Sequence, residues 1–191
     1  MTPGPPRVLT IGHSTRPIDD FIAMLTAHGV GEIVDVRTIP RSRHNPQFNR
    51  ESLPGALEKA GIGYVHMAGL GGLRHARKDS RNTGWRNSGF RGFADYMETP
   101  EFLSALGGLI EEAARTQVAI MCAEAVPWRC HRSLIADALT VRAIPVEHIM
   151  DKDKREAHKL TSFAHVAGTE IAYPAESAQQ GVLFGDPVPR G

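Results

Sequence analysis

Residues 117–132 read Gln-Val-Ala-Ile-Met-Cys-Ala-Glu-Ala-Val-Pro-Trp-Arg-Cys-His-Arg, an apolar run that leads into a polar segment. The run from Gln117 to Cys122 predicts a buried strand, and the residues from Trp128 to Leu139 predict a helix. A strand that ends here and a helix that starts near Trp128 would place four side chains around one crevice: Glu124, Cys130, His131 and Arg132. Because a helix N-terminus favours anions, the segment predicts a site for a negatively charged ligand.

Outside this segment, apolar runs alternate with helical stripes along the chain. Strands are expected over 7–12, 32–36, 62–66 and 144–150, and helices over 17–28, 51–60 and 90–115, the last interrupted near Thr99-Pro100. Alternation of this kind indicates a mainly parallel sheet covered by helices on both faces. We predict an α/β fold, an open three-layer sandwich of Rossmann-like or flavodoxin-like type, with a long basic insertion after the third strand. Residues 1–150 would form one domain, and residues 151–191 a C-terminal extension partly packed on it.

Composition limits the class of protein. The chain has 191 residues, of which 41% are apolar and 23% charged, enough for a substantial core. It contains no run of about 18 apolar residues, and its N-terminus lacks the apolar core of a signal peptide. Its two cysteines do not form a disulfide framework. We therefore expect a cytoplasmic protein with no membrane association.

The charge of the chain is unevenly distributed. The net charge is +1, but residues 37–91 contain eleven Lys and Arg against three acids, which gives that segment +8 and the remainder −7. Such asymmetry points to a polyanionic partner, DNA or another nucleic acid, although a solvated loop surface would explain the charge alone equally well.

Polar residues follow several of the predicted strands. They are Gly12-His-Ser-Thr15, Asp35-Val-Arg37, His66, Cys122-Ala-Glu124 and His148. In open α/β folds, ligands bind beyond the carboxyl ends of the strands, so these residues are expected to surround one site.

The same residues carry a resemblance to the domain-of-unknown-function 488 family of bacterial proteins. The matching pieces are Thr10-Ile-Gly-His-Ser-Thr15, Val34-Asp-Val-Arg37 with Pro40 and Ser42, Phe48-Asn49, Leu70-Gly-Gly72, Cys122-Ala-Glu124 with Cys130-His-Arg132, and Ala172-Tyr-Pro174. The resemblance covers nearly the whole chain and implies a compact α/β domain with a shared polar site. The resemblance does not specify an activity, which depends on the chemistry of the residues in the site.

Three residues are the candidate catalytic groups: Asp35, Glu124 and His131. Two carboxylates at adjacent strand ends could serve as acid and base, although a salt bridge of Asp35 to Arg37 or Arg132 is an equally good interpretation. Arg129 and Arg132 would lie in the first turn of a helix, where cations oppose the macrodipole unless an anion binds. The candidate substrate- or phosphate-binding residues are His13, Ser14, Thr15, Arg37, Arg43, Asn49, Arg129 and Arg132.

The insertion after the third strand mixes cations with aromatic rings. Cations neutralise phosphates, and rings stack on exposed bases or wedge into a duplex. The alternative is that Trp85 and Phe90 anchor the insertion to the core. The candidate nucleic-acid-binding residues are Arg74, Arg77, Lys78, Arg81, Trp85, Arg86, Phe90 and Arg91.

The two cysteines allow two further interpretations. Cys130, at a helix start, could be a nucleophile with a lowered pKa, and zinc could be bound by Cys122, Cys130, His131 and His13. The spacing C-x7-C-H matches no recognised zinc motif, and nucleotide-binding glycine motifs are absent, so we predict neither a metal nor another cofactor.

The leading functional hypothesis is an enzyme that hydrolyses the N-glycosidic bond of a modified or damaged base, a DNA glycosylase-like repair activity that flips the base into the crevice. The first alternative is a thiol- or phosphate-ester-processing enzyme that acts on a small nucleotide through Cys130. The second is a non-catalytic DNA- or RNA-binding module. In addition, Gln180-Gly-Val-Leu-Phe184 resembles a peptide that binds the bacterial sliding clamp, although burial of Leu183 and Phe184 against the domain is the better-favoured interpretation.

Overall fold

The computed structural model describes residues 6–175, which are built around one six-stranded sheet. The strands are β1 (Val8–Gly12), β2 (Glu32–Asp35), β3 (Gly63–His66), β4 (Val118–Cys122), β5 (Val146–Ile149) and β6 (Arg155–Ala157), in the order β3-β2-β4-β1-β5-β6. The first five strands are parallel, and β6 runs antiparallel to β5. The prediction of a mainly parallel α/β sandwich is confirmed.

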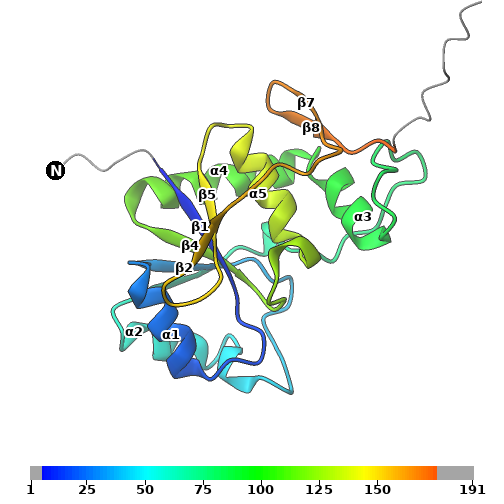
Figure 1. Ribbon diagram of the computed structural model, residues 1–191. Coiled ribbons are helices and arrows are strands. Elements are labelled where there is room, and N and C mark those ends of the chain that lie inside the picture. Colours follow the sequence, from blue (N-terminus) through cyan, green and yellow to red (C-terminus); the bar gives the residue numbers. More distant parts are fainter. Residues whose placement is uncertain (1–5, 176–191) are drawn as a thin grey trace, which may run out of the picture.

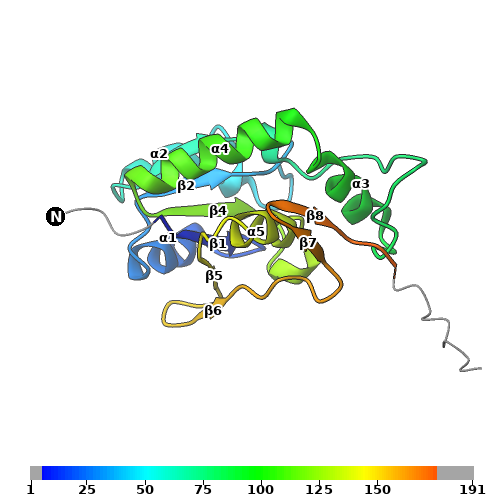
Figure 2. The ribbon, with the colours of Figure 1, turned by 90° about the horizontal axis from the view of Figure 1, so that it is seen from above.

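Helices cover both faces of the sheet, as Figures 1 and 2 show. On one face lie α1 (Ile18–Ala27) and α2 (Leu53–Glu58), and on the other α4 (Pro100–Arg115) and α5 (Arg132–Thr140), while α3 (Ser88–Tyr96) lies to the side of the sheet. The expected interruption of the helix over 90–115 near Thr99-Pro100 is confirmed, since α3 and α4 are separate helices. Thr99 caps the second of them by accepting a hydrogen bond from the Phe102 N–H, and Pro100 occupies the first helical position.

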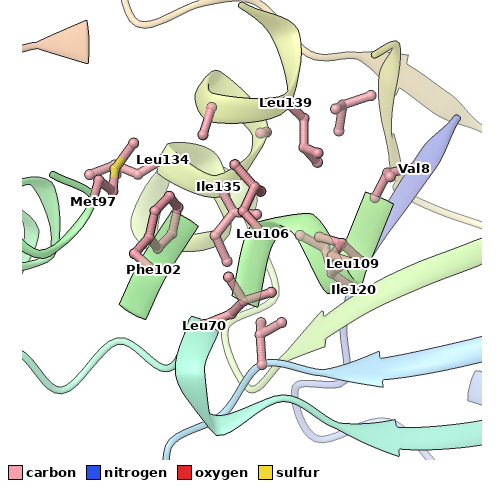
Figure 3. Packing of buried hydrophobic residues seen from close by; sticks show 14 of the residues in the cluster. Val8, Leu70, Met97, Phe102, Leu106, Leu109, Ile120, Leu134, Ile135 and Leu139 are labelled. Atoms are coloured by element: carbon pink, nitrogen blue, oxygen red, sulfur yellow. The ribbon is translucent and has the colours of Figure 1, made fainter. Parts of the chain in front are cut away.

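The alternation of side chains along the strands separates two cores. In β1, Leu9 and Ile11 pack with the side chains of α1 and α2. Val8 faces the opposite side, where it joins Ile120 and the apolar stripes of α4 and α5 (Figure 3). Because β1 and β4 are buried on both faces, they have the near-continuous apolar sequence typical of central parallel strands.

The strand order differs from the expected Rossmann-like or flavodoxin-like arrangement. In those sheets the first strand pairs with the second. Here β4 lies between them and pairs with both β1 and β2. The consequence is that the carboxyl ends of β1, β4 and β2 are direct neighbours, so the polar residues after these three strands converge.

The segment before α5 also differs from the prediction. We expected a helix from Trp128, but Pro127–Arg129 form a short 3₁₀ turn, Cys130 is extended (φ −136°, ψ 146°), and α5 begins at Arg132. The expectation that Arg129 lies in the first turn of the helix is therefore wrong, and Cys130, expected at a helix start, lies two residues before α5. Arg132 is in the first turn, as expected.

The described part of the C-terminal extension packs on the domain. β6 extends the main sheet, and β7 (His165–Ala167) pairs with β8 (Glu170–Ala172) in a hairpin whose turn contains Gly168 at a φ of +63°. Ile171 and Tyr173 are buried in the core on the α4 and α5 side. The predicted clamp-binding peptide, Gln180–Phe184, lies outside the described residues. Over the described range, no helix combines the length and apolarity needed to cross a membrane.

Candidate active site

A pocket of about 660 Å³ opens at the carboxyl ends of β1, β2 and β4. Its wall comes from the segments that follow these strands, from the start of the insertion and from the N-terminus of α3. The lining includes eight of the residues singled out from the sequence: His13, Ser14, Thr15, Arg37, Glu124, Arg129, Cys130 and His131. Phe90 of the insertion also lines it, together with Cys122. Parallel strand ends thus gather the polar residues that the sequence placed after each strand.

Gly12 allows the segment after β4 to pass close to the end of β1. A Cβ atom at residue 12 would lie 1.8 Å from the Glu124 carbonyl oxygen and 2.8 Å from the Ala125 Cα. The two chains continue to pair beyond the strands, because the N–H groups of His13 and Ser14 donate to the carbonyls of Cys122 and Ala123 at 3.0 and 2.9 Å. This close approach holds Glu124 beside the pocket.

Asp35 is fully buried and does not line the pocket. Its carboxylate binds Arg37 through two side-chain hydrogen bonds, Nε to Oδ1 at 2.9 Å and Nη2 to Oδ2 at 2.6 Å, and the Tyr64 hydroxyl donates to Oδ2 at 2.7 Å. Burial and the bond to Asp35 raise the pKa of Tyr64, which keeps it a donor. Of the two expected carboxylates, Asp35 therefore holds Arg37, while Arg37 reaches the pocket lining.

His13 is neutral in the fold. Its ring stacks on Phe48 with centroids 4.2 Å apart, and burial lowers its pKa to about 4. Nδ1 lies 2.8 Å from the Ser14 carbonyl, which can only accept, so the proton is on Nδ1. Nε2 then accepts from Arg37 Nη1 at 3.3 Å. This chain of hydrogen bonds fixes Arg37 from the side opposite to Asp35.

Cys122, Cys130 and His131 form a compact group in the pocket lining. The imidazole Nε2 donates to the Val36 carbonyl at 3.1 Å, which leaves Nδ1 facing Cys130 Sγ at 3.7 Å and Cys122 Sγ at 4.0 Å. A hydrogen bond from the Cys122 thiol, opposed by burial but supported by His131, lowers the pKa of Cys130 well below its usual value. The same bond and burial raise the pKa of Cys122. Cys130 is thus the sulfur favoured as thiolate.

Arg132 is placed differently from the expectation that it grips a phosphate. Its side chain is 1% exposed and does not line the pocket. Nη1 donates to Thr10 Oγ1 at 3.2 Å and Nη2 to the Glu124 carbonyl at 2.6 Å. Arg132 therefore fixes the backbone after β4 and supplies a buried positive charge behind the cysteines.

The charged groups of the pocket that are free to meet a ligand are Glu124, Arg41 and Arg129. All three are exposed and line the pocket, and none has a side-chain ion pair or hydrogen bond within the described residues. Asn49, by contrast, accepts a hydrogen bond from the Ser42 N–H at 2.6 Å and so shapes the loop, while Arg43 is exposed outside the lining. The arrangement offers one carboxylate in a cationic pocket.

Most side chains of the basic insertion are engaged within the protein. Arg77 and Arg81 pair with Glu98, Arg74 lies over the Tyr96 ring at 3.6 Å, and Arg91 donates to the Trp85 carbonyl. Trp85 stacks on Phe90 and packs against Phe163 and Tyr173. The interpretation in which Trp85 anchors the insertion to the core fits this packing, and Lys78 and Arg86 remain exposed without an ion pair in the described chain.

Sequence reasoning missed the apolar rim of the pocket. Five large apolar side chains are exposed among the described residues, and two of them, Ile39 (65% exposed) and Leu73 (71%), line this pocket. They come from the loops after β2 and β3. The only sequence signal was an isolated apolar residue in each of two otherwise polar loops. Asn45 and Asn87, which also line the pocket, were not singled out either.

The fold and the site define an α/β protein with a polar pocket at the carboxyl ends of its parallel strands, the edge at which open α/β sheets bind ligands. The chain belongs to the family described as Domain of unknown function DUF488, whose model matches residues 17–139, more than half of the chain. No curated protein and no solved structure matches it. The matched range contains β2 to β4 and the cysteine segment, and therefore most of the pocket.

Proposed function

We propose that this protein is an enzyme that hydrolyses the N-glycosidic bond of a modified or damaged base in nucleic acid, after the base has been flipped into the pocket. The observation that carries the proposal is the position of Glu124, a free carboxylate in a cationic pocket whose rim bears the exposed side chains of Ile39 and Leu73. The pocket volume lies in the range that encloses a nucleotide-sized ligand. A cytoplasmic location is part of the proposal.

Glu124 would orient the attacking water and stabilise the positive charge that develops on the sugar. The Phe90 ring, part of the lining, would stack on the extruded base. Arg37 is held by Asp35, and Arg41 and Arg129 are free to contact flanking phosphates. His131 has no role in proton transfer here, because Nε2 already donates to Val36 and Nδ1 faces the sulfurs.

The apolar rim favours a duplex substrate. Base-flipping proteins insert apolar side chains between base steps, which offsets the unstacking cost of a few kcal/mol. Leu73 and Ile39 project from different loops beside the pocket and are too exposed to stabilise the core. In this proposal they occupy the gap that the flipped base leaves.

The test is incubation with oligonucleotides that carry single modified bases, followed by alkali cleavage at abasic sites. We expect cleavage for at least one base and a loss of about 100-fold or more with Glu124→Gln, because the water loses its orienting carboxylate. Glu111→Gln, on the exposed side of α4, is the matched control and should retain activity. Leu73→Ala should reduce cleavage of duplexes much more than of single strands.

Two results would contradict the proposal. One is intact strands for every modified base tested. The other is a protein that binds DNA but cleaves no modified base, and whose affinity for DNA is unchanged by Glu124→Gln. That result would identify a non-catalytic binding module. The affinity should fall with increasing salt, because the free arginines displace counterions from phosphates.

A second candidate is a thiol-dependent enzyme that processes a phosphate ester or a small nucleotide. It is favoured by the 3.7 Å separation of Cys130 Sγ from His131 Nδ1 and by the Val36 carbonyl that orients the imidazole. Cys130→Ser separates the two candidates. Glycosidic hydrolysis predicts that the variant retains activity, whereas the thiol mechanism predicts that it has none.

A further inference from the structure

Three metal-binding atoms converge at one place in the pocket lining. Cys122 Sγ, Cys130 Sγ and His131 Nδ1 all lie within 4.8 Å of one another, with His131 Nδ1 at 4.0 Å and 3.7 Å from the two sulfurs. Tetrahedral zinc with bonds of about 2.3 Å to sulfur and about 2.0 Å to nitrogen separates sulfur from nitrogen by about 3.5 Å and sulfur from sulfur by about 3.8 Å. Small side-chain adjustments would therefore produce this geometry.

The three atoms are already oriented as metal ligands. The Nε2–H of His131 donates to the Val36 carbonyl, the arrangement that directs a bare Nδ1 toward a metal. The Cys130 sulfur accepts the backbone N–H of Arg132 at 3.5 Å. This bond stabilises a thiolate ligand. Gly72 keeps the space beside Nδ1 clear, since a Cβ there would lie 2.6 Å from that atom.

The local charge also suits a pair of thiolates. The guanidinium of Arg132 is buried behind them and makes no ion pair with a carboxylate among residues 6–175. An uncompensated buried cation is costly and favours anions beside it. Two thiolates beside Arg132 are stabilised by its charge, and a divalent cation between them cancels their mutual repulsion without adding a net positive charge to the thiolate pair.

We propose that Cys122, Cys130 and His131 bind a divalent metal ion, preferably zinc, with the fourth coordination position open to the pocket. Structural zinc sites have four protein ligands, whereas three ligands and an open position are typical of sites that bind water or substrate. His13 does not complete the set, because both of its ring nitrogens are engaged by Ser14 and Arg37. The inference is independent of glycosidic hydrolysis, but it excludes a nucleophilic Cys130, whose thiolate the metal would occupy.

The test titrates the full-length reduced protein with Co²⁺, whose thiolate charge-transfer absorption reports sulfur ligation, and then with Zn²⁺. We expect one Co²⁺ per chain, displaced by Zn²⁺. We expect Co²⁺ binding to weaken by about 100-fold or more in each of three variants, Cys122→Ser, Cys130→Ser and His131→Ala. This loss exceeds the effect of removing a residue that only hydrogen-bonds to a metal ligand. The matched control is His66→Gln, because His66 also bonds a backbone carbonyl, that of Arg37, but does not line the pocket. It should bind normally.

The absence of a charge-transfer band in the wild-type protein, or equal Co²⁺ binding by all variants, would overturn the proposal. A second measurement on the wild type avoids dependence on the folding of the variants. Zn²⁺ should slow alkylation of both thiols, and a chelator should restore the rate. An alkylation rate that is the same with and without Zn²⁺ would also overturn the proposal.

Discussion

At the scale of single residues, the site depends on side chains that the fold has removed from water. Three buried side chains hold other groups in place through hydrogen bonds. Asp35 and His13 both bond the Arg37 side chain, and Arg132 bonds the backbone carbonyl of Glu124. Substitution of such a side chain destabilises the protein, because a buried polar partner left without its hydrogen bond lowers the free energy of unfolding by about 1–3 kcal/mol. The groups left free, Glu124 above all, are those that can act on a ligand.

The buried neutral histidines predict a fall in stability on acidification. Burial lowers the pKa of His13 and of His148 to about 4, against 6.5 in the unfolded chain. Below pH 6.5 the unfolded chain therefore binds more protons than the folded one, and the free energy of unfolding decreases until pH 4 is reached, by up to about 3 kcal/mol per histidine. Urea unfolding between pH 7 and pH 4.5 measures this slope.

His13→Gln should flatten the slope, whereas His44→Gln, at an exposed position, should leave it unchanged. An identical pH dependence for His13→Gln and the wild-type protein would show that His13 titrates normally in the fold.

At the scale of secondary-structure elements, the decisive contact is the close approach of β1 to the segment after β4. The parallel register places Gly12 opposite Cys122, so the chain after β4 crosses the end of β1 at once. The missing side chain at Gly12 allows Arg132, at the start of α5, to reach both Thr10 and the Glu124 carbonyl. One glycine thus positions residues from three elements.

Gly12→Ala should disrupt this contact. The added methyl group would overlap the Glu124 carbonyl, and no flexible side chain can move aside, so we expect a loss of about 2 kcal/mol or more in the free energy of unfolding, together with loss of pocket activity. The matched control is Gly107→Ala in α4, which has open space around the Cβ position and should gain up to about 1 kcal/mol. Equal stability of the two variants in urea unfolding would contradict this account.

At the scale of the whole molecule, Tyr173 joins three distant parts of the chain. Its hydroxyl donates to Asp137 of α5 at 2.8 Å, its N–H donates to Asn82 at 2.9 Å, and its carbonyl accepts from the Gly84 N–H at 2.8 Å. Asp137 also accepts from Thr161 and bonds His158. The C-terminal segment and the insertion are therefore held against α5 together.

Tyr173→Ala should release both segments. Loss of a fully buried ring costs about 3–5 kcal/mol, whereas Tyr173→Phe removes only the bond to Asp137 and should cost about 1–2 kcal/mol. Limited trypsin digestion should cleave the Tyr173→Ala variant first at the arginines of the insertion. Val166→Ala, in the exposed part of β7, is the control. Cleavage at the insertion that is no faster than in the wild type would show that the insertion does not depend on Tyr173.

The sequence by itself determined the alternation of strands and helices, the parallel sheet and the polar character of the strand ends. These features follow from local patterns of apolar residues, because a strand that is buried on both faces requires a continuous apolar run in the sequence. The sequence predicts that α5 starts near Trp128, whereas the helix starts at Arg132. The 3₁₀ turn that begins at Pro127 and the extended conformation of Cys130 prevent the helix from starting earlier. The strand order could not be derived, since pairing of β4 between β1 and β2 depends on contacts between residues far apart in the chain.

Only the tertiary structure decided which polar residues are available for chemistry. Asp35 and Glu124 are both carboxylates at the ends of neighbouring strands, yet Asp35, the last residue of β2, is buried against Arg37, while Glu124, which follows β4, is free in the pocket. The exposed Ile39 and Leu73 and the grouping of both cysteines with His131 likewise arise from loops that meet across the sheet. The physical reason is that a residue's type fixes its chemistry, while its burial and partners, which are set by the packing of distant segments, fix whether that chemistry can reach a ligand.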